Sequence, residues 1–256
     1  MIPVRGGAST DAQAEAPSPT VRPSARVVVF PGSNGDLDLY EALSQAGFAV
    51  DYHDARQAVS RDVDLVGLPG GFSYGDYWRA GMLASRAAAV QSLSQVIAAR
   101  GLVIGICNGF QILIEAGYLP GALTYNSPPR FLHAWVDVQV TAAAHAVRSP
   151  WFCGLPAGKR MRLPIAHAEG CYVPPAGVSS PGIPLVYCRN PNGSFADAAA
   201  LLDDTGRVLG IMPHPERAAD ITLGSESGAA LFRAAFAYAS ARAQRTVSAR
   251  RVEAPC

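Results

Sequence analysis

The segment Leu102–Ile114 reads LVIGICNGFQILI and joins a strand-forming run to a helical run around one cysteine. The apolar run Leu102–Ile106 predicts a buried strand, and the residues after the cysteine have helical spacing. Gly105 and Gly109 bracket Cys107, and glycine at these offsets lets the chain turn sharply while strand and helix pack closely. The pattern Gly-x-Cys-x-Gly therefore predicts a nucleophile elbow with cysteine in the place of serine.

The elbow predicts a chemical role for Cys107. A sulfur atom at a helix N-terminus is favoured as thiolate by the positive end of the helix dipole. The backbone N–H of Asn108 is expected to face the same space and to donate to a developing oxyanion. The alternative, open at this point, is that Cys107 is a small buried hydrophobe, as most cysteines are. The other four cysteines lie in no such context and are assigned no role: Cys153, Cys171, Cys188 and Cys256.

Strands and helices alternate on both sides of the elbow. Before it, the spacing predicts strands at 26–30, 48–52 and 63–68 and helices at 36–46 and 78–99. After a helix at 108–116, it predicts short strands at 133–140, 162–166, 185–187, 198–202 and 208–212 and a last helix at 225–241. Strands alternating with helices imply right-handed crossovers and a parallel sheet covered on both faces. We therefore expect one α/β domain, with antiparallel strands added in the C-terminal half.

Composition sets the expected limits of this domain. Residues 1–25 are rich in Ala, Pro, Ser and Thr without periodicity, which predicts a disordered N-terminal extension. Residues 242–256 contain four arginines and few apolar residues, which predicts a loose C-terminal tail. The folded domain is accordingly expected at 26–241.

Bulk properties exclude several classes of protein. Of the 256 residues, 49% are hydrophobic and 16% are charged, which is typical of a globular chain. The formal net charge of +1 provides no overall field for nucleic acid or an anionic membrane. The sequence contains no apolar stretch of the roughly 18 residues that a transmembrane helix needs, and no signal-peptide core. Five cysteines without CxxC spacing predict neither a disulfide framework nor a zinc site. We expect a cytoplasmic protein with no bound metal, no nucleic acid and no membrane partner.

A proton carrier for the cysteine is found late in the chain. His214 lies in GIMPHPER, at the end of a predicted buried strand, where open α/β sheets bind their ligands. Glu216 follows two residues later, and in extended chain these two side chains face the same way. A carboxylate there can orient the imidazole and stabilise its protonated form. The alternative is a proline-rich turn with an incidental histidine.

Other candidates carry weaker signals. His133 and His145 lie in or beside an amphipathic strand and are expected at the surface or in packing, whereas His167 lies in a loop that is plausible near a site. The sequence LPGGFSYGD at 68–76 follows a strand, and its Gly-Gly pair is suited to expose backbone N–H groups for an oxyanion. Many glycine pairs, however, are only turns.

The order PGGFSYGD, GICNGFQIL, MPHPER resembles the class I, triad-type glutamine amidotransferases. The further stretches RFLHAWVDVQV, LPIAHAEGCYV and NPNGS are similar to the glutaminase subunits of phosphoribosylformylglycinamidine synthase within that family, over about Val27 to Tyr238. The resemblance implies a flavodoxin-like fold of class I glutamine amidotransferase type. One departure is HAEG at 167–170, where that group usually has HGEG.

The resemblance also implies roles for individual residues. Cys107 would attack the side-chain amide of glutamine, and the N–H groups of Asn108 and Gly71 would hold the oxyanion. His214, oriented by Glu216, would protonate the leaving ammonia before water hydrolyses the thioester. Gln111, four residues after the cysteine, would face the pocket.

The same resemblance implies partners. Ammonia would pass to a larger synthetase subunit that uses ATP and Mg²⁺ to make formylglycinamidine ribonucleotide in purine biosynthesis, and a small accessory subunit would join the complex. No cofactor is expected in this chain, which lacks the Gly-x-x-x-x-Gly-Lys-[Ser/Thr] loop for ATP. The alternatives are a paralogue that serves a different synthetase, a stand-alone cysteine hydrolase and a non-catalytic subunit.

Overall fold

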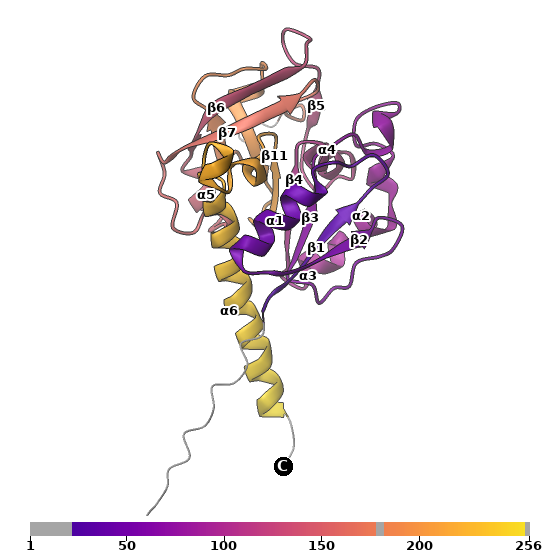
Figure 1. Ribbon diagram of the computed structural model, residues 1–256, viewed down its shortest axis with the longest axis vertical. Coiled ribbons are helices and arrows are strands. Elements are labelled where there is room, and N and C mark those ends of the chain that lie inside the picture. Colours follow the sequence, from indigo (N-terminus) through magenta and orange to yellow (C-terminus); the bar gives the residue numbers. More distant parts are fainter. Residues whose placement is uncertain (1–21, 178–181, 254–256) are drawn as a thin grey trace, which may run out of the picture.

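The computed structural model describes residues 22–177 and 182–253, with side chains up to residue 245, and they fold around one nine-stranded sheet (Figure 1). The strand order is β2-β1-β3-β4-β11-β10-β9-β6-β7. The parallel part contains β1 (Ser24–Val29), β2 (Ala49–Asp54), β3 (Leu65–Leu68), β4 (Leu102–Ile106) and β11 (Val208–Ile211). The antiparallel part contains β10 (Ala198–Leu202), β9 (Leu185–Tyr187), β6 (Leu132–Val140) and β7 (Arg160–His167). The expected α/β class, with a parallel core and added antiparallel strands, is confirmed.

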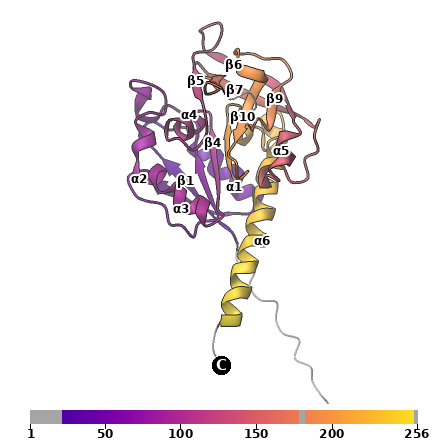
Figure 2. The ribbon, with the colours of Figure 1, turned by 180° about the vertical axis from the view of Figure 1, so that it is seen from behind.

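Helices cover both faces of the parallel part. Strands β3, β4 and β11 are buried along their whole length, as their continuous apolar sequences require. Helices α1 (Asp36–Ala46) and α6 (Ala229–Glu253) lie on one face. Helices α2 (Ala88–Gln91), α3 (Leu93–Ala98) and α4 (Asn108–Glu115) lie on the other, as the view from behind shows (Figure 2). The C-terminal ends of the neighbouring strands β3, β4 and β11 therefore lie side by side at one edge of the sheet.

Small elements were missed by the sequence pattern. Strands β5 (Ala122–Thr124) and β8 (Cys171–Val173) form a separate two-stranded sheet, and α5 (Ala143–Ala146) is a single turn. Each is three or four residues long, which is too short to show a period.

The expected single helix at 78–99 is wrong. The segment contains a 3₁₀ turn at Ala84–Arg86 followed by α2 and α3. Gly81 has a φ of 80°, and a side chain there would lie 2.7 Å from the backbone nitrogen of Ile112 in α4. Ala87 is extended, with φ −64° and ψ 147°. The chain is therefore interrupted where it passes close to the elbow helix.

Both expected domain boundaries change. Strand β1 begins at Ser24, two residues inside the expected N-terminal extension, and the Ser24 N–H donates to Asp64 at 2.9 Å. The rest of that extension, residues 1–21, lies outside the described chain. Helix α6 begins at Ala229 rather than 225 and continues to Glu253, so the helix extends beyond the expected domain end at 241. Arg242 forms an ion pair with Asp64 and donates to the carbonyl of Ala99, which joins the helix to the sheet layer. Residues 254–256 are outside the described chain.

The helices in the described part of the chain include none with the length and apolar character to cross a membrane.

Candidate active site

Cys107 lies at the turn between β4 and α4 in a backbone conformation that non-glycine residues rarely adopt, with φ 51° and ψ −104°. A side chain at Gly109 would overlap the carbonyl oxygen of Leu68, and one at Gly105 would overlap the carbonyl oxygen of Gly109. Both glycines are therefore required for the close approach of β3, β4 and α4. The structure places the cysteine in the strained elbow that its sequence predicts.

Three parallel strands bring the cysteine and the histidine together. Cys107 follows β4 and His214 follows β11, and the Cys107 N–H donates to Ile211 of β11 at 2.8 Å. Gly70 follows β3 on the other side of the cysteine. A side chain at Gly70 would lie 2.8 Å from Cε1 of His214 and 3.5 Å from Cβ of Cys107. Glycine at this position therefore lets the imidazole approach the sulfur.

The imidazole of His214 is held from behind by a carboxylate. Its Nδ1 lies 2.6 Å from Oε1 of Glu216, and the two side chains are 3% and 1% exposed. The backbone N–H of His214 donates to the carbonyl of Pro164 at 2.8 Å, which anchors the residue to β7. The carboxylate holds Nδ1, so that Nε2, which has no hydrogen-bond partner among the described residues, is the ring nitrogen left to exchange a proton.

Charge in this buried pair favours the protonated imidazole. Burial is the largest single effect and lowers the pKa of His214, because it penalises the cation. The carboxylate of Glu216 and the sulfur of Cys107 together outweigh burial and raise the pKa of His214 to about 10. The imidazole beside Cys107 is therefore protonated at neutral pH.

The expected oxyanion donors lie next to the cysteine. Asn108 is the first residue of α4, so its N–H is at the helix N-terminus. Gly71 has a φ of 140° and pairs with Ser33 in an isolated bridge, and a side chain at Gly71 would lie 2.7 Å from the amide nitrogen of Asn34. The backbone at Gly71 has no room for a side chain, and Gly71 and Cys107 border the same cavity.

The side chain of Asn108 ties the loop after β3 to the elbow helix. Its Oδ1 accepts from the Ser73 N–H at 3.1 Å, and its Nδ2 donates to Asp76 at 3.1 Å and to Gln111 at 2.9 Å. Gln111 in turn donates to the carbonyl of Glu169 at 2.8 Å. Gln111 borders the pocket, as expected, and positions the chain after β7 at the same time.

A cavity of about 70 Å³ opens beside the sulfur. Its lining brings together the loop after β3, the elbow helix and the end of β7: Gly71, Phe72, Asp76, Ala80, Cys107, Gln111, Phe131, Ala166, His167, Ala168 and Glu169. The carbonyl of Ala166 accepts from the sulfur at 3.6 Å. The cavity is small and joins the sulfur to two acidic residues, Asp76 and Glu169.

His167 also borders this cavity, in agreement with its expected place near a site. It is 3% exposed, and its Nδ1 lies 3.0 Å from Oδ1 of Asn126. Burial first, and then the charge of His214, lower the pKa of His167 to about 4. His167 is therefore neutral where His214 is charged, and it does not compete as the proton carrier. His133 and His145 are both exposed and lie away from this cavity.

Two carboxylates at the cavity were not singled out from the sequence. Burial, and then the charge of Glu169, raise the pKa of Asp76 to about 6, partly offset by the hydrogen bond from Asn108. Both acidic residues lie inside stretches that carried the family resemblance, PGGFSYGD and HAEG. No short-range pattern, however, indicates that these stretches meet.

Comparison with known proteins agrees with this geometry. A model of the CobB/CobQ-like glutamine amidotransferase domain matches residues 22–179 and 182–238. The phosphoribosylformylglycinamidine synthase subunit PurQ of Thermotoga maritima is 41% identical over 218 residues, which cover 85% of this chain and 99% of that protein. The corresponding subunit of Pyrococcus horikoshii is 43% identical over 219 residues, covering 81% and 94%.

Solved structures give the same result. In the structure of PurLQS from Thermotoga maritima, one chain is 40% identical with a TM-score of 0.79, covering 85% of this chain and 99% of that chain. A putative GMP synthase protein from Thermoplasma acidophilum has a TM-score of 0.55 at 15% identity, covering 88% of this chain and 98% of that chain, which is a likeness of fold alone. This chain therefore belongs to the glutamine amidotransferase family and, within it, to the PurQ subunits of phosphoribosylformylglycinamidine synthase.

Proposed function

We propose that this chain hydrolyses L-glutamine to glutamate and ammonia and supplies the ammonia to a phosphoribosylformylglycinamidine synthase. One observation carries the proposal: Cys107 lies in a strained elbow against His214, and the imidazole is held by Glu216 at 2.6 Å. A nucleophile, a proton carrier and an orienting carboxylate are together the requirements for amide hydrolysis through a covalent intermediate.

In the first step the sulfur of Cys107 attacks the side-chain carbonyl carbon of glutamine. The negative charge that develops on oxygen is stabilised by the N–H groups of Gly71 and Asn108. When the tetrahedral intermediate collapses, the C–N bond breaks and the proton on Nε2 of His214 goes to the leaving amine. The products of this step are ammonia and a thioester on Cys107.

In the second step a water molecule replaces the leaving amine. His214, now neutral, takes a proton from this water as it attacks the thioester carbonyl, and the same N–H groups hold the oxyanion. The C–S bond then breaks to release glutamate and restore the thiolate beside a protonated His214. Loss of the thiolate charge in the thioester lowers the pKa of His214, which makes this base step feasible.

The α-ammonium group of glutamine is expected at the acidic end of the cavity. Asp76 and Glu169 border this end, and Gln111 links the chain at Glu169 to the elbow helix. We assign the two carboxylates to recognition of this charge, which distinguishes glutamine from simple amides.

The destination of the ammonia is a partner subunit. The relatives are named as subunits of phosphoribosylformylglycinamidine synthase, and the structural neighbour is a PurLQS assembly. By this relationship the chain works with a larger synthetase subunit and a small accessory subunit in the cytoplasm. ATP and Mg²⁺ are assigned to the larger subunit, and no cofactor is assigned to this chain.

The test is ammonia release from glutamine by the wild type and by Cys107→Ala, with and without the larger subunit and its ribonucleotide substrate. We expect release by the wild type, strengthened by assembly, and none by Cys107→Ala. Cys153→Ala is the matched control, because that cysteine is exposed and lies away from the site. Equal release by wild type and Cys107→Ala contradicts the mechanism. Release with no transfer to the ribonucleotide substrate supports the paralogue or the stand-alone hydrolase instead.

A further inference from the structure

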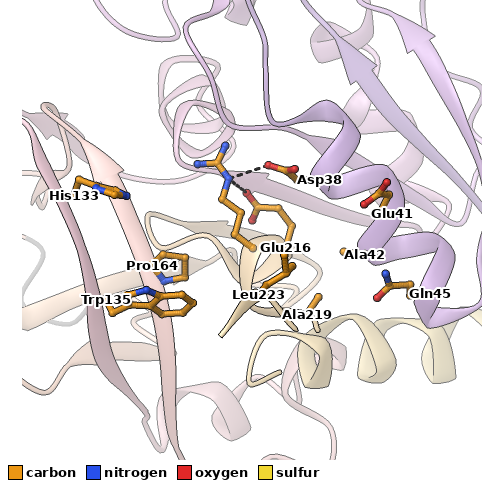
Figure 3. Close-up of a pocket in the computed structure, with 11 residues that line it drawn as sticks. Asp38, Glu41, Ala42, Gln45, His133, Trp135, Pro164, Glu216, Ala219 and Leu223 are labelled. Carbon is orange, nitrogen blue, oxygen red and sulfur yellow. Dashed lines mark hydrogen bonds and ion pairs between the residues drawn. The ribbon is translucent and has the colours of Figure 1, made fainter. Parts of the chain in front are cut away.

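The orienting carboxylate has a second cationic neighbour, on the side away from the sulfur. Arg217 follows Glu216 in the 3₁₀ turn Pro215–Ala218, and its Nε lies 3.8 Å from Oε1 of Glu216. The same Nε donates to Oδ2 of Asp38 at 2.9 Å. In Figure 3 the carboxylates of Asp38, on helix α1, and Glu216 lie near one another, and dashed lines mark the two ion pairs that they share with one guanidinium. One guanidinium is therefore shared unequally by two acids, of which only one belongs to the catalytic group.

The guanidinium lies closer to the exposed carboxylate of Asp38, although burial alone favours its ion pair with the buried Glu216. The side chain of Glu216 is 1% exposed, whereas that of Asp38 is 41% exposed, and ion pairs are weaker where water screens them. Oε2 of Glu216 has no hydrogen-bond partner among the described residues, so this carboxylate has acceptor capacity to spare. The guanidinium nevertheless lies closer to the exposed carboxylate of Asp38 than to the buried one of Glu216.

The surroundings leave the guanidinium room to move. A cavity of about 360 Å³ lies between α1 and β6–β7 and is bordered by Asp38, Glu216 and Arg217, with Glu41, Trp135 and Leu223 among its other walls (Figure 3). Arg217 is not packed on all sides, since 36% of its side chain is exposed. Its position thus depends on its ion pair rather than on steric fit.

We propose that Asp38 is a positioning residue that holds Arg217 away from Glu216, so that the carboxylate stays committed to His214. Without Asp38, Arg217 forms a close ion pair with the carboxylate of Glu216 and draws it away from the imidazole. This is a role in the glutaminase reaction for a residue on α1, 176 positions before the histidine in the sequence (214 minus 38). The inference rests on the proposed function.

The direction of the effect follows from charge. A guanidinium that moves onto Glu216 weakens the hydrogen bond to Nδ1 and adds a positive charge near the imidazolium, and both changes favour the neutral ring. At a given alkaline pH, a smaller fraction of the enzyme then has His214 protonated and able to donate to the leaving amine. Three ionisable groups interact directly with His214: Glu216 in the 3₁₀ turn, Cys107 after β4 and His167 in β7. Arg217 in the same turn and Asp38 and Glu41 on α1 border the cavity that Glu216 also borders, and Tyr187 in β9 interacts with Cys107.

The test compares Asp38→Asn with the double variant Asp38→Asn/Arg217→Gln. The measurement is kcat/KM for glutamine against pH, on the complex with the larger subunit, together with thermal unfolding of each variant. For Asp38→Asn we expect the alkaline limb of the profile to move to lower pH by about 0.5 unit or more. A shift of this size is typical when a charge, here the guanidinium of Arg217, moves close to a titrating group, here His214. In the double variant the limb returns to the wild-type position or above it, because the competing cation is gone.

A matched control distinguishes the restraint of Arg217 by Asp38 from the general effect of removing a negative charge from this part of α1. Glu41 lies one turn further along α1, borders the same cavity and has no ion pair within the described chain. Glu41→Gln should move the limb by less than half of the Asp38→Asn shift. The proposal is overturned if the double variant stays as displaced as Asp38→Asn, if Asp38→Asn does not move the limb, or if Glu41→Gln moves it equally. A wild type that releases no ammonia in the complex contradicts the proposed function instead.

Discussion

Nδ1 of His214 lies 2.6 Å from Oε1 of Glu216, inside a part of the protein where neither side chain is more than 3% exposed. A short contact of this kind between a ring nitrogen and a carboxylate is a charge-assisted hydrogen bond. It keeps the imidazole protonated in spite of burial, because the carboxylate and the nearby sulfur raise the pKa of His214 to about 10. The chemistry of the site therefore depends on this pair as much as on the cysteine.

Replacing the carboxylate tests that dependence. In Glu216→Gln the ring keeps a hydrogen-bond partner of the same shape but loses the charge that stabilises the imidazolium. We expect kcat for glutamine hydrolysis to fall by about 100-fold or more, with KM nearly unchanged. The alkaline limb of the pH profile should also move to lower pH. Both quantities come from steady-state ammonia release measured from about pH 6 to about pH 11, a range that includes both sides of the imidazole titration near 10, and an unchanged kcat contradicts the role of Glu216.

The raised pKa of Asp76 leads to a predicted pH dependence of glutamine binding. Because burial and Glu169 raise the pKa of Asp76 to about 6, its carboxylate gains a proton as the pH falls through 6. Loss of this negative charge weakens attraction for the α-ammonium group, so KM for glutamine should rise below about pH 6 while kcat changes less.

The variant Asp76→Asn checks the assignment. It should have a high KM at neutral pH and no further rise of KM as the pH falls from about 7 to about 5, because the titrating group is gone. The control is Asp62→Asn, because Asp62 is exposed and lies away from the cavity. If KM of Asp76→Asn still rises in acid, another group titrates there and the assignment to Asp76 is wrong.

A substitution at Gly109 tests how closely the elbow helix packs against β3. Its α-carbon lies so close to β3 that a methyl group would overlap the carbonyl oxygen of Leu68. Gly109→Ala should lower the free energy of unfolding by about 2 kcal/mol or more and remove most of the activity. Gly117→Ala is the control: it has a φ of 79° but open space around it, so the cost should be about 1 kcal/mol. Urea unfolding of both variants measures the difference, and equal costs would mean that the contact with β3 is not limiting.

Arg242 tests the corrected C-terminal boundary. Its side chain is 16% exposed, pairs with Asp64 and donates to the carbonyl of Ala99. Arg242→Ala should lower the free energy of unfolding by about 1–2 kcal/mol. The exposed Arg233 on the same helix provides the comparison, and Arg233→Ala should stay within about 0.5 kcal/mol of the wild type. A negligible effect at Arg242 would restore the view that the folded domain ends at residue 241.

The parts of the site that could be predicted from the sequence are those determined over a few residues. The elbow around Cys107 depends on two glycines, a buried strand and a helix start that follow one another directly in the chain. The pairing of His214 with Glu216 is equally local, since both follow the same strand. Backbone geometry alone relates residues at such short separations.

Other features escaped the sequence because distant contacts decide them. The broken helix at 78–99 has continuous helical spacing, but Gly81 meets α4 there and the chain cannot continue straight. Asp76 follows β3 and Glu169 follows β7, which are far apart in the sheet order, and the two acids meet only because the chain after β7 returns to the elbow. Just past residue 241 the last helix contacts a residue far away in the sequence, because Arg242 pairs with Asp64, which is 178 residues away.

By itself, then, the sequence determined the fold class, the elbow at Cys107 and the pairing of His214 with Glu216, because periodicity, glycine and the spacing of two residues act locally. The tertiary structure alone decided which carboxylates border the cavity, which cation lies behind Glu216 and how Asp38 restrains it. The physical reason is that strand order and helix packing are chosen by burial of apolar faces over the whole chain, and polar side chains meet where that burial places them.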